Sequence, residues 1–471
     1  MDGVDGARVG AYAWVVSAES LPPGPRGRVL TTLRLARDPI AHLPAWQARY
    51  GDPFTLGLVT GPVVVSGDPA LHRALFTADP DRFGVYSAGS LRPILGEHSL
   101  LVLEGVRHRR ERRLLAPPFH GARMRAYGEA IAAIAREALA VERAGRSFRA
   151  LDLGQRISLE VILRTVFGVE EEGRLAEFRG AIAAATASAH PLALFVPGLV
   201  DRFAAFGPFA RLRRDQERLC GLLGRAIADA RGREGERSDI LSRMLAARDE
   251  EGAPMSEAEL VDELRTLLIA GHETTAIALA WALHWLHREP AALGRLRAEL
   301  DALGPAPAPE AVAGLPYLMA VCQETLRLRP VVLAVVRRLV QPYEVAGWRL
   351  EPGVAVMASV LLTHRRAELY PEPERFRPER FLERSFAPHE HLPFGGGARR
   401  CLGAAFALYE LQIALAAILG AAEFEPVAPR PVRVVRRNLT MGPGDGIPLT
   451  IERWRGAGRP GGPGGRAQFS V

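Results

Sequence analysis

Apolar residues three and four positions apart recur along most of the chain and predict a mainly helical protein. Long stretches of this kind, rich in Ala, Leu, Arg and Glu, cover much of residues 120–300, and another begins just after residue 401. Two regions instead alternate or run apolar for a few residues, as strands do. The first, 54–66, turns at Thr60-Gly61-Pro62 and predicts a β-hairpin, and the second, 343–358, contains two glycine turns. The pattern indicates a mainly α fold with a minor β region.

The longest predicted helix runs from Ser256 to Arg288. Ser256 and Glu259 form a capping-box pattern at its start, and Pro290 follows its end. At about 1.5 Å per residue such a helix is about 45 Å long, enough to cross a domain of this size. Small and polar residues at 270–275 (Ala-Gly-His-Glu-Thr-Thr) interrupt its apolar face, although an interior glycine costs about 1 kcal/mol relative to alanine. The interruption therefore predicts a functional segment.

A glycine-rich loop at 394–403 (Phe-Gly-Gly-Gly-Ala-Arg-Arg-Cys-Leu-Gly) places Cys401 directly before an apolar helix. The unpaired N–H groups and the positive dipole end of that helix favour the thiolate, which is the form that binds metals. The glycines allow positive φ and a close approach to a flat cofactor, and Arg399 offers a cation for a cofactor carboxylate. We interpret Cys401 as a metal ligand; a buried structural cysteine is the alternative.

The spacing Phe-x-x-Gly-x-Arg-x-Cys-x-Gly closely resembles the haem-binding loop of the cytochrome P450 family, with matches at Phe394, Gly397, Arg399, Cys401 and Gly403. The resemblance extends in motif order over roughly residues 50–445. It implies a triangular, α-rich fold that encloses haem b, with Cys401 as the axial ligand of the iron. Thiolate ligation favours O–O cleavage. The implied activity is that of a monooxygenase, which inserts one atom of O2 into a C–H bond (hydroxylation) or a C=C bond (epoxidation).

The same resemblance assigns the interrupted helix to oxygen binding. Ala270 and Gly271 would leave room over the iron, and the pair Glu273 and Thr274 would deliver protons to bound O2. A hydroxyl backed by a carboxylate suits such a transfer.

Further motifs resemble a structural triad of the family. Glu324 and Arg327, three residues apart on a largely apolar helix, match its Glu-x-x-Arg pair. Arg380, in Phe-Arg-Pro-Glu-Arg-Phe, is assigned as the third member, and Arg375 is the alternative. By the resemblance, these residues hold the fold around the haem and do no chemistry.

Haem carries two propionates, and their burial requires cations or hydrogen-bond donors. By resemblance, this role falls to His108 and Arg112, one helical turn apart, and to Arg399. A further contact comes from Arg337 in the strand after the Glu-x-x-Arg helix, with Arg338 as the alternative. The family's site places no histidine on the iron.

Composition narrows the classes of function. All 60 basic residues are arginine, the formal net charge is +7, and acidic residues are interspersed, which is typical of a solvated surface and not of a nucleic-acid interface. The three cysteines are far apart and indicate no disulfide framework. No stretch approaches the roughly 20 apolar residues of a membrane span. We expect a cytoplasmic monomer with no membrane span and no nucleic-acid partner.

The two ends of the chain differ in composition from the rest. Residues 1–25 lead in through a Pro-rich segment without a secretory signal pattern, and 455–471 are rich in Gly, Pro and Arg. We predict tails at both ends. Residues 26–454 then form a single haem-thiolate monooxygenase domain.

The segments that form the family's substrate pocket are mainly aliphatic here: 83–103, 192–206, 267–270, 331–335 and 439–441. They predict an apolar substrate such as a terpenoid, a fatty acid or a polyketide-type secondary metabolite. Arg92 is a candidate for binding a carboxylate, with a surface role as the alternative. An arginine cluster near Cys401 predicts docking of an acidic ferredoxin or flavodoxin-type electron donor, which works with a reductase. Its members are Arg109, Arg110, Arg113, Arg399 and Arg400.

Three other readings stay open at this point. A peroxide-using or isomerising enzyme would lack proton delivery, which the Glu273–Thr274 pair argues against. A non-catalytic haem-thiolate sensor is disfavoured by that pair and by the apolar pocket segments. A protein without haem, in which Cys401 is structural, is the third.

Overall fold

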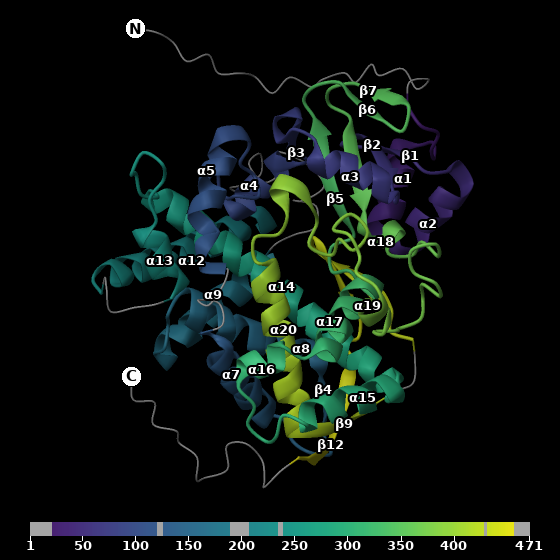
Figure 1. Cartoon of the computed structure of the whole chain (residues 1–471). Helices are drawn as coiled ribbons and strands as arrows, with labels where there is room; N and C mark the ends of the chain where they lie inside the picture. The colour runs from purple at the N-terminus through teal and green to yellow at the C-terminus, as the bar shows by residue number, and fades with distance from the viewer. Residues whose placement is uncertain (1–20, 120–125, 189–206, 234–238, 428–430, 456–471) are drawn as a thin grey trace.

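The computed structural model describes residues 21–119, 126–188, 207–233, 239–427 and 431–455. Helices make up most of it, and the largest sheet lies at one side (Figure 1). The predicted mainly α fold with a minor β region is therefore confirmed. The folded part includes residues on the edge of both predicted tails: Pro23 accepts a hydrogen bond from the Thr55 N–H (3.0 Å), and Arg455 pairs with Asp301 (2.8 Å).

The helices of the N-terminal half surround the centre of the molecule. They are α1 (Arg28–Arg37), α2 (Pro39–Tyr50), α3 (Pro69–Thr77), α4 (Ala88–Leu95), α5 (Gly105–Leu115), α7 (Gly128–Ala140), α8 (Ala150–Val161), α9 (Glu172–Ser188), α12 (Gly207–Arg231) and α13 (Ile240–Ala246). Three shorter turns accompany them: η2 (Pro80–Arg82), η3 (Pro117–Phe119) and the π-helical η4 (Ile162–Val166), which continues α8.

The C-terminal half supplies the central helices. They are α14 (Glu257–Arg288), α15 (Pro290–Asp301), α16 (Pro309–Ala313), α17 (Pro316–Leu328), α18 (Val360–Thr363), α19 (Arg380–Glu383) and α20 (Ala404–Ala421), which follows the turn η5 (Gly397–Arg399). In Figure 1, α20 runs down the middle of the molecule in front of α14, and the two helices contact each other.

The long helix predicted over 256–288 is α14. Its capping box is present: Ser256 Oγ accepts from the Glu259 N–H (3.2 Å), and Glu259 Oε2 accepts from the Ser256 N–H (2.7 Å). The helix packs against α8, α12, α17 and α20, and nearly every side chain from Thr275 to Leu283 is buried. Within the described residues, α14 and α20 are the two helices long and apolar enough to cross a membrane. Most of that apolar length is buried in this fold, as in the core helices of globular domains.

The largest sheet has the strand order β1-β2-β8-β5-β3. The strands are β1 (Phe54–Leu58), β2 (Gly61–Ser66), β3 (Phe83–Val85), β5 (Ala334–Leu339) and β8 (Ala355–Ser359). The predicted hairpin is the antiparallel pair β1 and β2, and β2 then pairs with β8 in parallel. The valines of β2 and all of β8 are buried between α2 on one face and α3 on the other, which explains their continuous apolar runs.

Three small sheets complete the fold. The strands are β6 (Tyr343–Val345) with β7 (Trp348–Leu350), β10 (Val434–Arg437) with β11 (Thr440–Pro443), and β9 (Ala422–Pro426) and β4 (Ser147–Arg149) on either side of β12 (Pro448–Trp454). The β10–β11 hairpin lies against α14, and Met441 N donates to Val331 O (2.8 Å) next to β5. The fold thus brings α14, the C-terminal hairpin and the segment before β5 together.

Candidate active site

The cysteine loop is closed by its own backbone. Cys401 N donates to Phe394 O (2.9 Å), and Arg400 N donates to Gly397 O (3.0 Å). Gly397 has φ +67°, and a Cβ added there would lie 2.6 Å from the carbonyl oxygen of Phe76 on α3. Both the left-handed conformation and this close approach require glycine. The loop therefore packs directly on α3 and places Cys401 three residues before the first residue of α20.

The Cys401 side chain is accessible to a water-sized probe, yet protein surrounds the sulfur on most sides. This burial raises the pKa of the thiol, while the Gly403 N–H, Arg112 and Arg400 lower it in part. The Gly403 N–H at the start of the helix thus acts in the predicted direction, although desolvation of the sulfur outweighs it. A bound metal ion supplies the positive charge that deprotonates a coordinating thiol.

Three arginines and a histidine converge near the loop. Each guanidinium donates to a backbone carbonyl: Arg112 to Arg400 O (2.7 Å), Arg399 to Leu103 O (2.5 Å) and Arg337 to Val336 O (3.2 Å). Among the described residues, none of the three forms an ion pair with a carboxylate. Burial lowers the pKa of Arg399, and the nearby carboxylate of Glu104 opposes this only in part.

The electrostatics of this arginine group indicate excess positive charge. Burial, together with Arg399, lowers the pKa of Arg337 to about 10. Burial and then Arg399 and Arg112 lower the pKa of His108 to about 4. Arg338, the alternative to Arg337, is exposed, since consecutive residues of β5 face opposite sides. Half-buried cations that form no ion pair among the described residues fit a dianionic ligand, and haem, with its two propionates, is such a group.

The interrupted segment of α14 begins at accessible residues. Ile269 is 38% exposed and Ala270 is also exposed, although the helix after Thr274 is buried. Gly271 has a different reason to be small: a Cβ added there would lie 3.0 Å from Cδ1 of Ile162 in η4. Gly271 therefore has a packing reason to be small, and its predicted place over a cofactor stays a prediction, as does that of Ala270, whose exposure fits it.

The acid and the alcohol of this segment point to different partners. Thr274 Oγ1 donates to Ala270 O (2.7 Å) within the helix. Glu273 Oε1 accepts from Arg437 Nε (3.2 Å), and Glu273 Oε2 accepts from Thr440 Oγ1 (3.1 Å). The two adjacent residues project about 100° apart around the helix, so the carboxylate lies at the C-terminal hairpin and the hydroxyl beside the Ala270 carbonyl.

Glu324, Arg327 and Arg380 meet in the interior. Arg327 donates from Nε to Glu324 Oε2 (2.6 Å) and from Nη2 to Oε1 (2.9 Å), and Arg380 Nε donates to the same Oε1 (3.1 Å). Their side chains are at most 3% exposed. Arg375, the alternative third member, has an exposed side chain that pairs with Glu372, and it contributes only its backbone carbonyl to the group.

Four contacts of the site have no local signal in the sequence. Arg437 and Thr440 bind Glu273 from a hairpin more than 160 residues away. Ser158 of α8 donates to Gly271 O (3.2 Å), and Phe76 packs under the glycines of the cysteine loop. Each depends on the packing of distant elements, so only the assembled fold reveals it.

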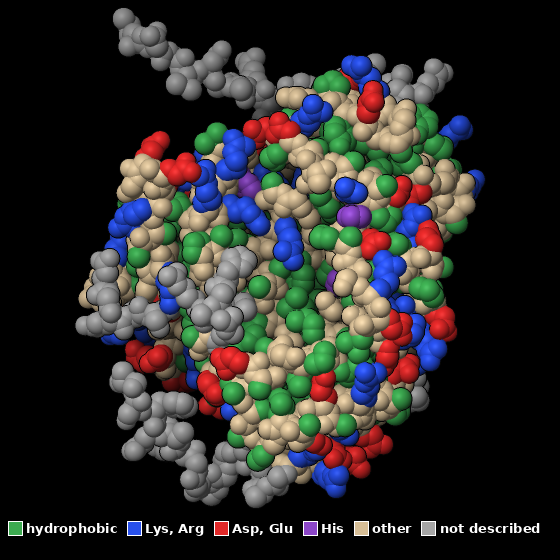
Figure 2. Space-filling view, in the orientation of Figure 1, with side chains coloured by type: hydrophobic (Ala, Val, Ile, Leu, Met, Phe, Trp, Pro, Cys, Tyr) green, Lys and Arg blue, Asp and Glu red, His purple; other side chains and the backbone are tan. Residues whose placement is uncertain are grey.

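The predicted arginine cluster is only partly available as a docking surface. Arginine side chains gather over α5 and near the loop before α20 in Figure 2. Three of them are occupied, however: Arg109 pairs with Asp81 (2.6 Å), Arg113 with Glu250, and Arg110 with Asp249 (2.6 Å) and two glutamates. The Arg110 guanidinium faces three carboxylates of this chain, so its charge is the most compensated of the cluster, and donor docking stays a prediction.

The predicted pocket segments are placed in part. Residues 192–206 lie outside the described residues, whereas Leu101, Val332 and Leu439 expose 42–54% of their surface in three of the other segments. Arg92 pairs with Glu97 (3.3 Å) at the surface, which favours its surface role.

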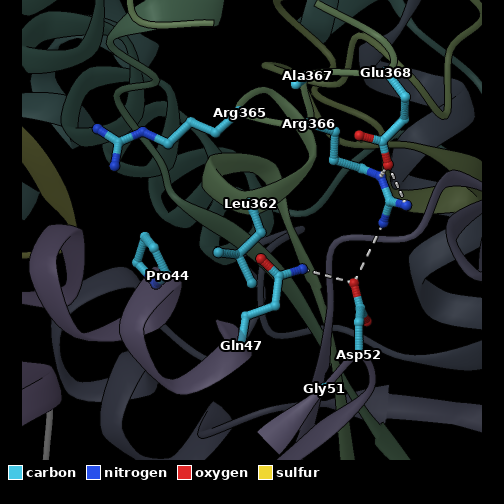
Figure 3. A pocket seen from close by; sticks show the side chains of 9 residues that line it. All are labelled: Pro44, Gln47, Gly51, Asp52, Leu362, Arg365, Arg366, Ala367 and Glu368. Carbon is cyan, nitrogen blue, oxygen red and sulfur yellow. Dashed lines mark hydrogen bonds and ion pairs between the residues drawn. The ribbon is translucent and has the colours of Figure 1, made fainter. Parts of the chain in front are cut away.

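A separate cleft of about 470 Å³ lies between α2 and the segment after α18 (Figure 3). Gln47 and Arg366 both point to Asp52 there, and Arg366 also pairs with Glu368. Its polar groups thus satisfy one another, and it contains no residue of the cysteine loop.

Comparisons with known proteins extend over nearly the whole chain. A family model described as Cytochrome P450 matches residues 22–444. Cytochrome P450 135B1 of Mycobacterium tuberculosis is 40% identical over 448 residues, covering 93% of this chain and 93% of that protein. Cytochrome P450 137 of the same species is 34% identical over 455 residues, covering 92% and 93%. The solved structure of retinoic acid bound cyanobacterial CYP120A1 has a TM-score of 0.81 at 26% identity, covering 92% of this chain and 99% of that one.

Proposed function

Because the chain belongs to the cytochrome P450 family of haem-thiolate monooxygenases, we propose that it inserts one oxygen atom from O2 into a C–H or C=C bond of an apolar small molecule. The observation that carries the proposal is the position of Cys401. Cys401 is exposed at the start of a buried apolar helix, beside half-buried arginines that form no ion pair among the described residues.

We assign the cofactor site to the cysteine loop and the arginine group. Cys401 would bind the iron, Phe394, Gly397 and Gly403 shape its loop, and Arg112, Arg337, Arg399 and His108 would hold the propionates of haem b. When bound, thiolate-ligated haem supplies the activation of O2. The chain supplies a fixed sulfur and compensating positive charge. Glu324, Arg327 and Arg380 keep the surrounding backbone in place through buried ion pairs.

Proton delivery is assigned to Glu273 and Thr274. The Thr274 hydroxyl lies one helical turn from the accessible Ala270, beside that residue's carbonyl. Glu273 is held at the edge of the same segment and connects it to the more exposed hairpin. An acid and an alcohol at adjacent positions can pass a proton from the surface to the interior of the site.

The substrate proposal is an apolar molecule such as a terpenoid, a fatty acid or a polyketide-type metabolite of secondary metabolism. The accessible side chains of the pocket segments are aliphatic, as in Leu101, Ile269, Val332 and Leu439. The relative CYP120A1 binds retinoic acid, an elongated apolar molecule, in its solved structure. Apolar walls favour such a ligand through burial of its surface.

We propose a ferredoxin or flavodoxin-type protein as the electron donor, with its reductase, for a monomeric cytoplasmic enzyme. Arg400 is exposed next to Cys401 and makes no ion pair among the described residues. Acidic donors dock on such a surface through electrostatic attraction that weakens as salt rises.

The test of the proposed function is the carbon monoxide difference spectrum of the reduced protein. The wild type and a Cys220→Ser control are expected to give the band of thiolate-ligated haem, and Cys401→Ser is expected to lose it. A wild-type protein that binds no haem, or that shows a histidine-type band, would overturn the proposal. Turnover that requires peroxide in place of O2 and a reduced donor would identify the peroxide-using class, and absence of any product would identify a sensor.

A further inference from the structure

The C-terminal hairpin β10–β11 touches the acid of the proton-delivery pair. In its register Arg437 lies opposite Thr440, and the turn residue Asn438 has φ +54°. Asparagine tolerates this left-handed conformation better than most residues, which suits it to a tight turn. The turn sets the Arg437 guanidinium and the Thr440 hydroxyl side by side and facing α14.

Both side chains bind Glu273, and each takes a different carboxylate oxygen. Arg437 Nε donates to Oε1 (3.2 Å), and Thr440 Oγ1 lies 3.1 Å from Oε2 and 2.7 Å from the carbonyl oxygen of Arg437. The carboxylate is 19% exposed and the guanidinium 32% exposed. The Thr440 hydroxyl has one proton, for which Oε2 and the Arg437 carbonyl compete, so Arg437 is the stronger and Thr440 the weaker restraint on the direction of the carboxyl plane.

The same hairpin reaches the predicted substrate pocket. Leu439, in its turn, is 54% exposed, whereas Met441 is buried and its N–H binds Val331 O (2.8 Å). Val332, the next residue after that carbonyl, is 42% exposed. The hairpin thus has an accessible apolar residue beside the two groups that hold the acid.

We propose that Arg437 and Thr440 are positioning residues that hold Glu273 in the orientation required for proton delivery. The inference rests on the proposed function, since it assigns the control of the same site. Loss of either donor frees the carboxylate and slows proton transfer to bound O2. More of the consumed O2 is then released as hydrogen peroxide, formed with two electrons from the reduced donor protein and two protons from solvent, and less substrate is oxidised.

The chain offers a matched control on the same strand. Arg436, the neighbour of Arg437, donates away from α14, to Ala36 O (3.0 Å) and Leu35 O (3.2 Å) of α1. Arg436→Gln therefore removes one arginine from the hairpin without touching Glu273. Thr440→Ser keeps the hydroxyl that Thr440→Val removes, so it is the conservative rescue.

The experiment uses the haem-loaded enzyme with NADPH, a plant-type ferredoxin and its reductase, and retinoic acid as the probe compound. The solvent isotope effect on O2 consumption and the peroxide released per O2 are measured in each variant. Arg437→Gln and Thr440→Val are expected to change the isotope effect at least twofold and to release more peroxide than Arg436→Gln. Thr440→Ser is expected to match the wild type. Values for Arg437→Gln and Thr440→Val equal to those of Arg436→Gln would overturn the proposal.

A second readout does not depend on turnover. Thermal midpoints of Glu273→Gln, Arg437→Gln and the double variant form a cycle, and the proposed contact predicts that the two shifts are not additive. Additive shifts would count against the contact. If the wild type lacks the thiolate band, the proposed function itself fails. If the band is present but the isotope effect is unchanged and the shifts in midpoint are additive, only the positioning role of Arg437 and Thr440 is refuted.

Discussion

Removal of the negative charge of Glu324 is expected to destabilise the protein strongly. In Glu324→Gln the amide occupies the same volume but leaves Arg327 and Arg380 without a counter-ion. The carboxylate accepts four hydrogen bonds, three from these guanidinium groups and one from the Arg377 N–H (2.8 Å). All three charged side chains are essentially buried, so water cannot replace the missing partner.

The magnitude follows from this burial. Removal of one partner from a buried ion pair costs about 3–5 kcal/mol, because the other charge stays desolvated. The matched control is Glu372→Gln, which breaks the ion pair with Arg375 (3.3 Å) at side-chain exposures of 60–62%. An exposed pair of this kind contributes about 0–1 kcal/mol.

The assay is urea unfolding of the haem-loaded variants followed by far-UV circular dichroism, with haem retention measured in parallel. A loss of several kcal/mol lowers the midpoint by on the order of 1 M urea, whereas the control stays near the wild type. The reasoning would be refuted by a Glu324→Gln midpoint that matches Glu372→Gln, since the buried charges would then be compensated by other groups.

Two further predictions concern the hydroxyl of α14 and a buried carboxyl of α20. Thr274→Ala is expected to keep the thiolate spectrum but to convert most of the consumed O2 into peroxide, whereas Thr274→Ser is expected to keep the wild-type ratio of oxidised substrate to consumed O2. Oxygen and peroxide electrodes measure O2 consumption and peroxide release. A wild-type ratio in Thr274→Ala contradicts proton delivery through Thr274. Burial raises the pKa of Glu410 to about 8, although a hydrogen bond from Ser158 opposes this. Because the folded pKa lies above the unfolded value, the native state binds the extra proton, and stability is lost as the pH rises from about 4.5 to about 8. Glu410→Gln is expected to reduce the fall in thermal midpoint between pH 5 and pH 9. If the midpoint of the variant falls with pH as steeply as that of the wild type, burial does not raise the pKa of Glu410.

The parts of the site that sequence predicted are those set by neighbours in the chain. The cysteine loop, the capping box at Ser256 and the 324–327 pair each depend on a few adjacent residues, and the structure has all three geometries. Turn and helix chemistry of this kind is local. The register of β5 likewise separates Arg337 from Arg338 once the strand is formed, because alternate residues face opposite sides.

The contacts that sequence missed are set by packing between distant segments. Arg110 lies in a run of arginines typical of an exposed helix, but residues about 140–150 positions later place Asp249 and Glu259 against it. Gly271 lies in a motif that suggests space for a ligand, whereas Ile162 of η4 is the group that its missing Cβ accommodates. Neither partner leaves a trace in the local pattern, since side-chain pairing across a core depends on the whole fold.

The charges around Cys401 connect cofactor binding to folding. Arg112, Arg337 and Arg399 are held by backbone carbonyls, and burial lowers the pKa of all three. A carbonyl offers only a partial negative charge, so each guanidinium pays a desolvation cost that a propionate would offset. A ligand that binds only the native state stabilises it by RT ln(1 + c/Kd), where c is the ligand concentration, so the stabilisation increases with the logarithm of that concentration. A dianionic cofactor that binds these arginines would therefore stabilise the folded chain. Burial also raises the pKa of the Cys401 thiol, and binding of iron would favour its deprotonated form.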